Sequence, residues 1–310
     1  MSWILLTVAA QFINALVAIG DKYLVTDKKA LPKPFVYAFY TCIVTVFWVL
    51  IYPIGLLPGM SMLGVPQIGN VMTPSLLVIA ISFLSAYTFF IAILAFYEAL
   101  KSANTSDVMP VVGATSAVSS FALSWFFLGT DYPGHFIWGI LLLVGGTLMV
   151  SRMRLSLRAA LVTVVSGIFF AFHYLTMKIL FTETSFDDGF FWSRMALILA
   201  ALSLLLFPRC FKAVFGKTNK VTKSTGWLVF ANKIMAGVAA FLILKATDWG
   251  DVAVIQALDG LKFVFILVIA FMFSRFLPMS VREEKADLKT ILHKVFYVLI
   301  ICLGFIVLII

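Results

Sequence analysis

Five ionisable side chains fall within long apolar segments in the second half of the chain: His173, Arg194, Lys233, Asp259 and Lys262. Charged groups are costly inside a bilayer, so such residues usually face a water-filled cavity or a partner. At about 1.5 Å of rise per residue, the five positions fall in one slab of the bilayer. The sequence therefore predicts that four helices gather these groups into one polar site.

These residues also have ordinary structural explanations. Asp259 and Lys262 are three residues apart on one helix and could neutralise each other. Arg194 and Lys233 could extend to the membrane interface, and a lone His173 could be a hydrogen-bonded packing residue. If Asp259 and Lys262 pair, Arg194 and Lys233 leave a basic excess, which favours a ligand with an anionic group, either carboxylate or phosphate.

Uncharged polar and aromatic residues extend the candidate site. In the second half, Asn232 and Gln256 could add hydrogen bonds, while Tyr174 and Trp192 could form an amphipathic wall. The first half offers two amides three residues apart in its first apolar segment, and tyrosines in its second and third. The complete candidate substrate-binding set is Gln11, Asn14, Tyr40, Tyr87, His173, Tyr174, Trp192, Arg194, Asn232, Lys233, Gln256, Asp259 and Lys262.

The sequence gives no pattern for a metal or a cofactor. Cys42, Cys210 and Cys302 are scattered, without a C-x-x-C or Cys/His spacing. Gly216-Lys217-Thr218 is similar to the end of a P-loop, but Phe211 occupies the position of the required glycine. We therefore expect no metal, no cofactor and no ATP-driven step.

The composition is that of a membrane protein. Apolar residues make up 63% of the 310 residues and charged residues only 12%, and the mean hydropathy is +1.09. A soluble domain is nearer half apolar and a quarter charged. The net charge of +9 does not indicate a nucleic-acid partner, because most Lys and Arg residues lie in short runs between apolar blocks. A soluble enzyme, a disordered protein and a nucleic-acid-binding domain are excluded.

Ten apolar blocks have about the length that a helix needs to cross the hydrocarbon, which is roughly 20 residues. They are about twice as long as β-barrel strands and do not alternate in polarity. The expected fold is an all-α integral membrane protein with ten transmembrane helices. The blocks are 2–20, 35–54, 75–97, 108–128, 134–151, 159–181, 189–207, 226–245, 252–274 and 291–310.

Similar segments recur in the same order in the two halves of the chain. The matched pairs are 22–27 with 178–183, 35–53 with 190–208, and 99–113 with 246–260. This predicts two five-helix repeats, 1–155 and 156–310. Because five is odd, the second repeat must enter the membrane from the opposite face, and such inverted repeats are typical of alternating-access transporters.

With this arrangement the chain resembles the EamA-like branch of the drug/metabolite transporter superfamily. The resemblance rests on Ala99-Leu100-Lys101-Ser102-Ala103-Asn104-Thr105-Ser106 leading into Pro110, and on Ile255-Gln256-Ala257-Leu258 in the second half. It covers the whole chain and implies secondary transport of small metabolites such as amino acids, drugs or sugar conjugates. Leu128-Gly129-Thr130-Asp131 lacks the basic residue that the family often has there, and a long basic stretch, 275–294, follows the ninth block.

Basic residues are distributed unequally between the two sides of the predicted bundle. Eighteen Lys and Arg residues fall in loops on one side, and two, Lys178 and Lys245, on the side that holds both termini. By the positive-inside rule the termini then lie outside the cytoplasm. The family resemblance instead implies that both termini are cytoplasmic. The expected location is the plasma membrane.

Three functions are compatible with these features. The first is a secondary active transporter that moves a small polar metabolite by alternating access, working as a monomer within membrane lipid. The second is a lipid or lipid-conjugate flippase. The third is a membrane-embedded enzyme acting on lipid-linked substrates, for which Asp187-Asp188 is the only close pair of carboxylates on the terminal side. The transporter is the preferred hypothesis, and no enzymatic activity is expected.

Overall fold

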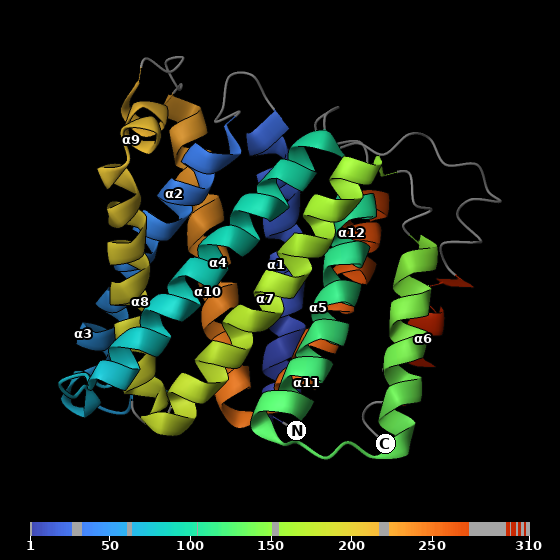
Figure 1. The fold of residues 1–310 in the computed structure, drawn as a ribbon, viewed down its shortest axis with the longest axis horizontal. Coiled ribbons are helices and arrows are strands. Elements are labelled where there is room, and N and C mark those ends of the chain that lie inside the picture. The colour runs from blue at the N-terminus through green and yellow to red at the C-terminus, as the bar shows by residue number, and fades with distance from the viewer. Residues whose placement is uncertain are drawn as a thin grey trace.

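The computed structural model describes residues 2–26, 33–60, 64–103, 105–150, 155–216 and 223–272, together with residues 296, 297, 299–301, 303, 304 and 307. All regular secondary structure in these ranges is helical, which confirms the predicted all-α class. Seven helical segments in the described ranges are long and apolar enough to cross a membrane, and a shorter apolar helix covers Gly134–Met149. The helices pack side by side at varied tilts (Figure 1) and indicate a multi-pass membrane protein.

Local signals explain where the helices of the first half begin. The elements are α1 (Ser2–Thr26), α2 (Pro34–Val44), η1 (Thr45–Leu50), α3 (Ile51–Gly55), η2 (Ile68–Asn70), α4 (Leu76–Ser102), α5 (Thr105–Leu128) and α6 (Gly134–Val150). Pro34 opens α2, where its missing backbone N–H would have no helical partner anyway. Ser75 caps α4, because its side-chain oxygen accepts a hydrogen bond from the Val78 backbone N–H.

The second half uses the same kind of capping. Its elements are α7 (Leu157–Glu183), α8 (Phe186–Ser203), η3 (Leu204–Leu206), α9 (Pro208–Phe215), α10 (Lys223–Trp249), α11 (Val252–Ala257), η4 (Leu258–Gly260) and α12 (Leu261–Met272). Ser156, Ser185 and Asp251 cap α7, α8 and α11 through side-chain oxygens that accept backbone N–H groups.

Eight of the predicted blocks correspond to described helices, while the first and the ninth blocks differ from the prediction in detail. The first helix does not end at Gly20 but continues to Thr26, because the charged groups of Asp21 and Lys22 find partners inside the protein. The ninth block is not one regular helix, since the 3₁₀ turn η4 lies between α11 and α12. Most of the tenth block lies outside the described residues, so ten spans stay a prediction.

The main helix contacts join the two halves of the chain. α4 packs along α7, and α1 packs along α10. The largest cluster of buried apolar residues, which includes Tyr37, Phe90 and Leu197, fills the space where α1, α2, α4 and α8 meet. Such extensive packing between the halves places the helices from both around one central region (Figure 1).

Two lysines, the buried Lys22 and the partly buried Lys178, each hold the C-terminal end of another helix, and we call these contacts the lysine clamps. Lys22 Nζ donates to the carbonyl oxygens of Leu100 and Ala103, at 2.6 and 2.7 Å. Lys178 Nζ donates to those of Thr247, Asp248 and Gly250, at 3.0, 2.9 and 3.1 Å. The last carbonyls of a helix have no partner within it, and a cation there also suits the helix dipole.

The two clamps use equivalent positions of the predicted repeat. Lys22 and Lys178 begin the matched segments 22–27 and 178–183. Their acceptors fall at the same places within the matched segments 99–113 and 246–260, one and four residues after the first. The clamped ends of α4 and α10 lie at opposite ends of the bundle, at the top and the bottom of Figure 1.

The clamps change the charge count on which the predicted orientation rests. Lys22 and Lys178 lie within α1 and α7 and are not loop charges. Lys245 also lies within a helix, α10, and pairs with Asp248 at 3.8 Å. The basic stretch 275–294 lies outside the described residues. The loops at one end of the bundle still contain more Lys and Arg residues than those at the other end. The two clamp lysines do not contribute to this difference, because they bind helix ends and not the membrane surface.

Removing either clamp is expected to destabilise the protein to a similar extent. Lys22→Met and Lys178→Met each leave two or three buried carbonyls without their donor, at a cost of about 1.5–3 kcal/mol for a hydrogen-bonded charge. Both variants should lower the apparent melting temperature of the detergent-solubilised protein, whereas Lys212→Met, on an exposed lysine, should not. A clamp variant as stable as the wild type would show that its lysine does not stabilise the helix end that it contacts.

Two glycines at equivalent positions of the predicted repeat also meet. A Cβ placed on Gly113 of α5 would lie 3.6 Å from the Gly260 backbone nitrogen and 3.4 Å from Asp259 Oδ2. α5 and η4 therefore pass each other at this pair of glycines, and a Cβ on Gly260 would point to Leu143 and Thr147 of α6.

Candidate functional site

A cavity of about 140 Å³ lies between helices from both halves of the chain. Its wall comes from α1, α2, α4 and α5 of the first half and from α7, α10, α11, η4 and α12 of the second. Six of the predicted site residues line it: Asn14, Tyr174, Lys233, Gln256, Asp259 and Lys262. The structure thus brings together residues that are up to 248 positions apart, from Asn14 to Lys262.

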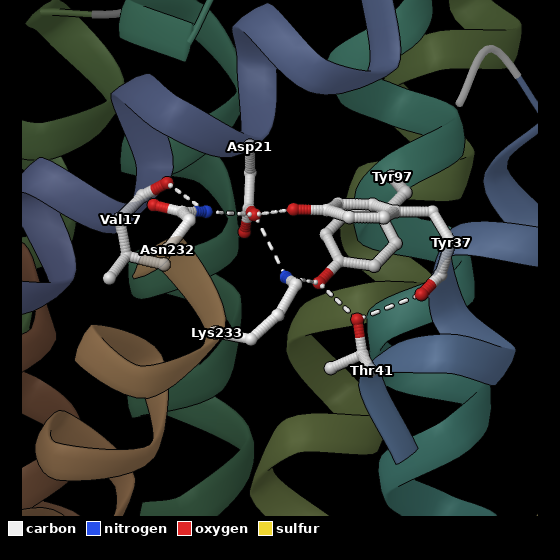
Figure 2. A network of polar contacts seen from close by, with 7 residues as sticks. All are labelled: Val17, Asp21, Tyr37, Thr41, Tyr97, Asn232 and Lys233. Atoms are coloured by element: carbon white, nitrogen blue, oxygen red, sulfur yellow. Dashed lines mark hydrogen bonds and ion pairs between the residues drawn. The ribbon is translucent and has the colours of Figure 1, made fainter. Parts of the chain in front are cut away.

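A buried ion pair forms one wall of this cavity. Lys233 Nζ lies 2.9 Å from Asp21 Oδ1 and donates to Tyr97 Oη at 2.8 Å. The same Asp21 oxygen accepts hydrogen bonds from Tyr37 Oη and from Asn232 Nδ2, the latter at 2.7 Å. Figure 2 shows the carboxylate of Asp21 at the centre of these contacts. We call Asp21, Tyr37, Tyr97, Asn232 and Lys233 the aspartate network.

The aspartate network keeps two charges away from water at little cost because their hydrogen bonds are largely satisfied. The side chains of Lys233 and Asp21 are only 3% and 5% exposed. Lys233 Nζ also lies 4.1 Å from the centre of the Tyr37 ring, which adds a cation–π contact. A buried pair needs such additional partners to offset the loss of hydration. The network links α1, α2 and α4 of the first half to α10 of the second.

A second ion pair lines the same cavity. Lys262 Nζ lies 2.7 Å from Asp259 Oδ1, and the two side chains are 12% and 13% exposed. The pairing expected from their spacing of three residues is therefore confirmed, and both groups still face the cavity. Asp259 belongs to the 3₁₀ turn η4, directly against Gly113.

Amide and hydroxyl groups complete the polar wall. Ser116 Oγ donates to Gln256 Oε1 at 2.8 Å, which joins α5 to α11. Asn14 Nδ2 donates to Gln11 Oε1 at 3.4 Å, so the two amides of α1 share a contact although Gln11 does not line the cavity. These groups give the cavity both donors and acceptors without adding net charge.

Arg194 borders a second, smaller cavity of about 60 Å³. Its side chain is buried, and its guanidinium carbon Cζ lies 5.3 Å from the centre of the Phe190 ring. Lys233 lines both cavities, so the two basic residues predicted to act together, Arg194 and Lys233, both stand in the wall of the smaller cavity. Among the described residues, no group of three His, Cys, Asp or Glu side chains is placed to hold a metal ion.

Sequence comparison does not assign the chain to a family: no family model and no curated protein matches it. Solved structures do resemble it. One of them, described only as the crystal structure of a protein, has a TM-score of 0.67 over 99% of this chain and 96% of its own, at 15% sequence identity. The likeness shows that an experimentally solved protein shares this fold along nearly its whole length.

Six predicted site residues line neither cavity: Gln11 and Asn232, which contact residues that do, and His173, Tyr40, Tyr87 and Trp192. His173 Nδ1 lies 2.9 Å from Ser85 Oγ, and its ring packs against Phe89 and Tyr174, as expected of a packing histidine. Tyr40 and Tyr87 are 37% and 39% exposed. Trp192 Nε1 donates to the Met72 carbonyl at 3.0 Å. Periodicity along one helix does not reveal which face its neighbours cover, so these positions could not be separated from the others.

Four other polar residues line the central cavity although the sequence did not single them out: Asp21, Thr41, Tyr97 and Ser116. Asp21 was treated as the end of the first apolar block. The apolar residues Leu24 and Val25 continue the helical pattern beyond it, and that signal places the carboxylate inside the span. Asn232, which was predicted, acts one step away from the cavity by holding Asp21.

Proposed function

We propose that this chain is a secondary active transporter that binds a small polar metabolite in the central cavity and exposes it alternately to the two sides of the membrane. The observation that carries the proposal is the cavity itself. Two ion pairs and several hydrogen-bonding groups stand in its otherwise apolar wall, it lies within a bundle of long apolar helices, and its wall comes from both halves of the chain. A packed structural protein has no need for two ion pairs around internal space.

Residue-level correspondence between the halves supports an inverted repeat of 1–155 and 156–310. The lysine clamps occupy equivalent positions at opposite ends of the bundle (Figure 1). The packing of α4 along α7 is matched by that of α10 along α1, as an exchange of the two repeats requires. Gly113 and Gly260, also equivalent, meet where α5 crosses η4. Ten helices arranged in this way are what the resemblance to the EamA-like transporters implies.

The aspartate network suggests how one access route is closed. Asp21 lies five residues before the end of α1, and Lys233 lies in the first half of α10, so the network sits between the cavity and the end of the bundle richer in basic loops. Opening the cavity toward that end requires α1 and α10 to separate there. We propose that the chain works as a monomer in the plasma membrane, with the network intact in the state described here.

Solute counterflow in proteoliposomes tests the transport function. Vesicles containing the purified chain and preloaded with amino acids, organic anions or phosphorylated sugars should accumulate the matching labelled compound, because exchange needs a carrier but no energy source. Protein-free vesicles are the control. Absence of exchange for every compound of such a panel would contradict the transport proposal.

The enzyme alternative is not supported by the position of its two carboxylates. Asp187 Oδ2 accepts hydrogen bonds from Gln67 N and Asn70 Nδ2, at 3.1 and 2.7 Å. Asp188 Oδ1 accepts one from Met72 N at 2.8 Å. Both side chains thus bind the segment before α4. Neither of them lines the central cavity or the smaller one. Lipid flipping, the other alternative, is separated from solute transport by following labelled lipids in the same vesicles.

A further inference from the structure

Arg194 is a buried cation without a protein partner. It lies on α8 and is 5% exposed, yet among the described residues it makes no hydrogen bond or ion pair, and its Nε is unsatisfied. The titratable groups that interact with it electrostatically include Cys42, Tyr52, His173 and Tyr174, and none of these is a carboxylate. A buried charge in such surroundings destabilises the folded state, so its presence points to a ligand of opposite charge.

The other cations around the two cavities already have carboxylate partners. Lys233 pairs with Asp21, and Lys262 pairs with Asp259. Within the part of the chain that the structure describes, Arg194 is the cation of the cavity walls that lacks such a partner. One positive charge, that of Arg194, is therefore available to a ligand. The sequence had suggested two, from Arg194 and Lys233 together.

The space beside Arg194 is small and shares part of its wall with the central cavity. Ala236 and Ala240, one helical turn apart on α10, line both cavities with short side chains. The rest of the smaller cavity is mostly aromatic, with Trp48, Phe190 and Phe241 in its wall. The wall residues common to both cavities are Thr41, Phe89, Lys233, Ala236 and Ala240.

We propose that Arg194 binds the carboxylate of a small monocarboxylate substrate, whose polar body lies in the central cavity beside the aspartate network. This inference rests on the proposed transport function and names its substrate class. A planar guanidinium matches a carboxylate through two parallel N–H···O bonds. One uncompensated cation in an aromatic pocket balances one negative charge, whereas a phosphate dianion would leave a charge unpaired.

Binding to the purified full-length chain in detergent tests the subsite without requiring transport. Acetate, propionate and lactate are titrated against their amides and against inorganic phosphate, with tryptophan fluorescence as the signal. Trp48 lines the same cavity as Arg194. If the fluorescence change disappears in Trp48→Phe, the change is assigned to Trp48. The carboxylates should bind at least tenfold more tightly than the amides. Equal binding of amides, tighter binding of phosphate, or no saturable signal with any carboxylate would overturn the proposal.

Two variants separate a ligand-binding arginine from a structural one. Arg194→Met should abolish the preference for carboxylates and also raise the apparent melting temperature without ligand, because it removes an unpaired buried charge. Arg209→Met, on an exposed arginine, should change neither property. A lower melting temperature for Arg194→Met, or an unchanged carboxylate preference, would contradict the proposal.

Failure of this subsite is distinguishable from failure of the transport function. A wild-type chain that exchanges solutes while Arg194→Met exchanges carboxylates with the same KM refutes the subsite alone. A wild-type chain that binds carboxylates through Arg194 but shows no counterflow refutes transport alone.

Discussion

Lys233→Met is expected to lower the free energy of unfolding by about 3–5 kcal/mol, because it leaves the carboxylate of Asp21 buried without its cation. Asp21 is 4% exposed, so water cannot replace the lost ammonium group. The remaining hydrogen bonds from Tyr37 and Asn232 satisfy only part of the charge. Denaturant unfolding or thermal melting of the detergent-solubilised protein measures the loss.

The double variant Asp21→Asn/Lys233→Met is the decisive comparison. It removes both charges, so it should be more stable than Lys233→Met alone, and the double-mutant cycle should give a coupling of 1 kcal/mol or more, on the order found for residues in contact. Lys212→Met, an exposed lysine on α9, controls for the loss of a positive charge. Strictly additive losses would show that Asp21 and Lys233 do not stabilise each other.

Lys262→Met is expected to reduce the uptake of carboxylates at least tenfold while leaving the protein folded. It exposes the uncompensated charge of Asp259 to the cavity, and that charge opposes an anionic substrate. Two unit charges about 10 Å apart, at an effective dielectric constant of about 20, interact by about 1.7 kcal/mol, which is more than a factor of ten. Initial uptake rates in proteoliposomes measure the effect.

Restoring neutrality should restore uptake. Asp259→Asn/Lys262→Met removes both members of the pair, so it should regain most of the activity lost in Lys262→Met. The melting temperature should change less than in the Lys233 variants, because both side chains of this pair still border the cavity. A double variant as inactive as Lys262→Met would mean that Lys262 contacts the substrate directly and does not act through its charge balance.

The sequence predicted what depends on pattern along the chain. The helical class and the seven long apolar helices in the described residues follow from the length and polarity of the apolar blocks. The pair Asp259–Lys262 follows from a spacing of three residues. The matched segments that begin at Lys22 and Lys178 carry the lysine clamps, although the sequence analysis counted both lysines as loop charges. In each case the residues concerned are close together along the chain, or they occupy matching positions in the two halves.

The sequence did not predict what depends on the rotation of each helix about its own axis. Tyr87 and Tyr97 lie on the same helix, yet Tyr87 is 39% exposed while Tyr97 is buried against Lys233. Arg194 and Lys233 both line the smaller cavity, but only Lys233 meets a carboxylate. Packing against neighbouring helices decides these outcomes, and a single sequence does not state which helices are neighbours.

The lysine clamps each act within one half of the chain. Among the described residues, the carbonyls that Lys22 holds belong to 1–155 and those that Lys178 holds belong to 156–310. A cut in the polypeptide near residue 155 would therefore sever neither clamp. On the proposed two-unit architecture, each unit holds the end of its own helix without help from the other.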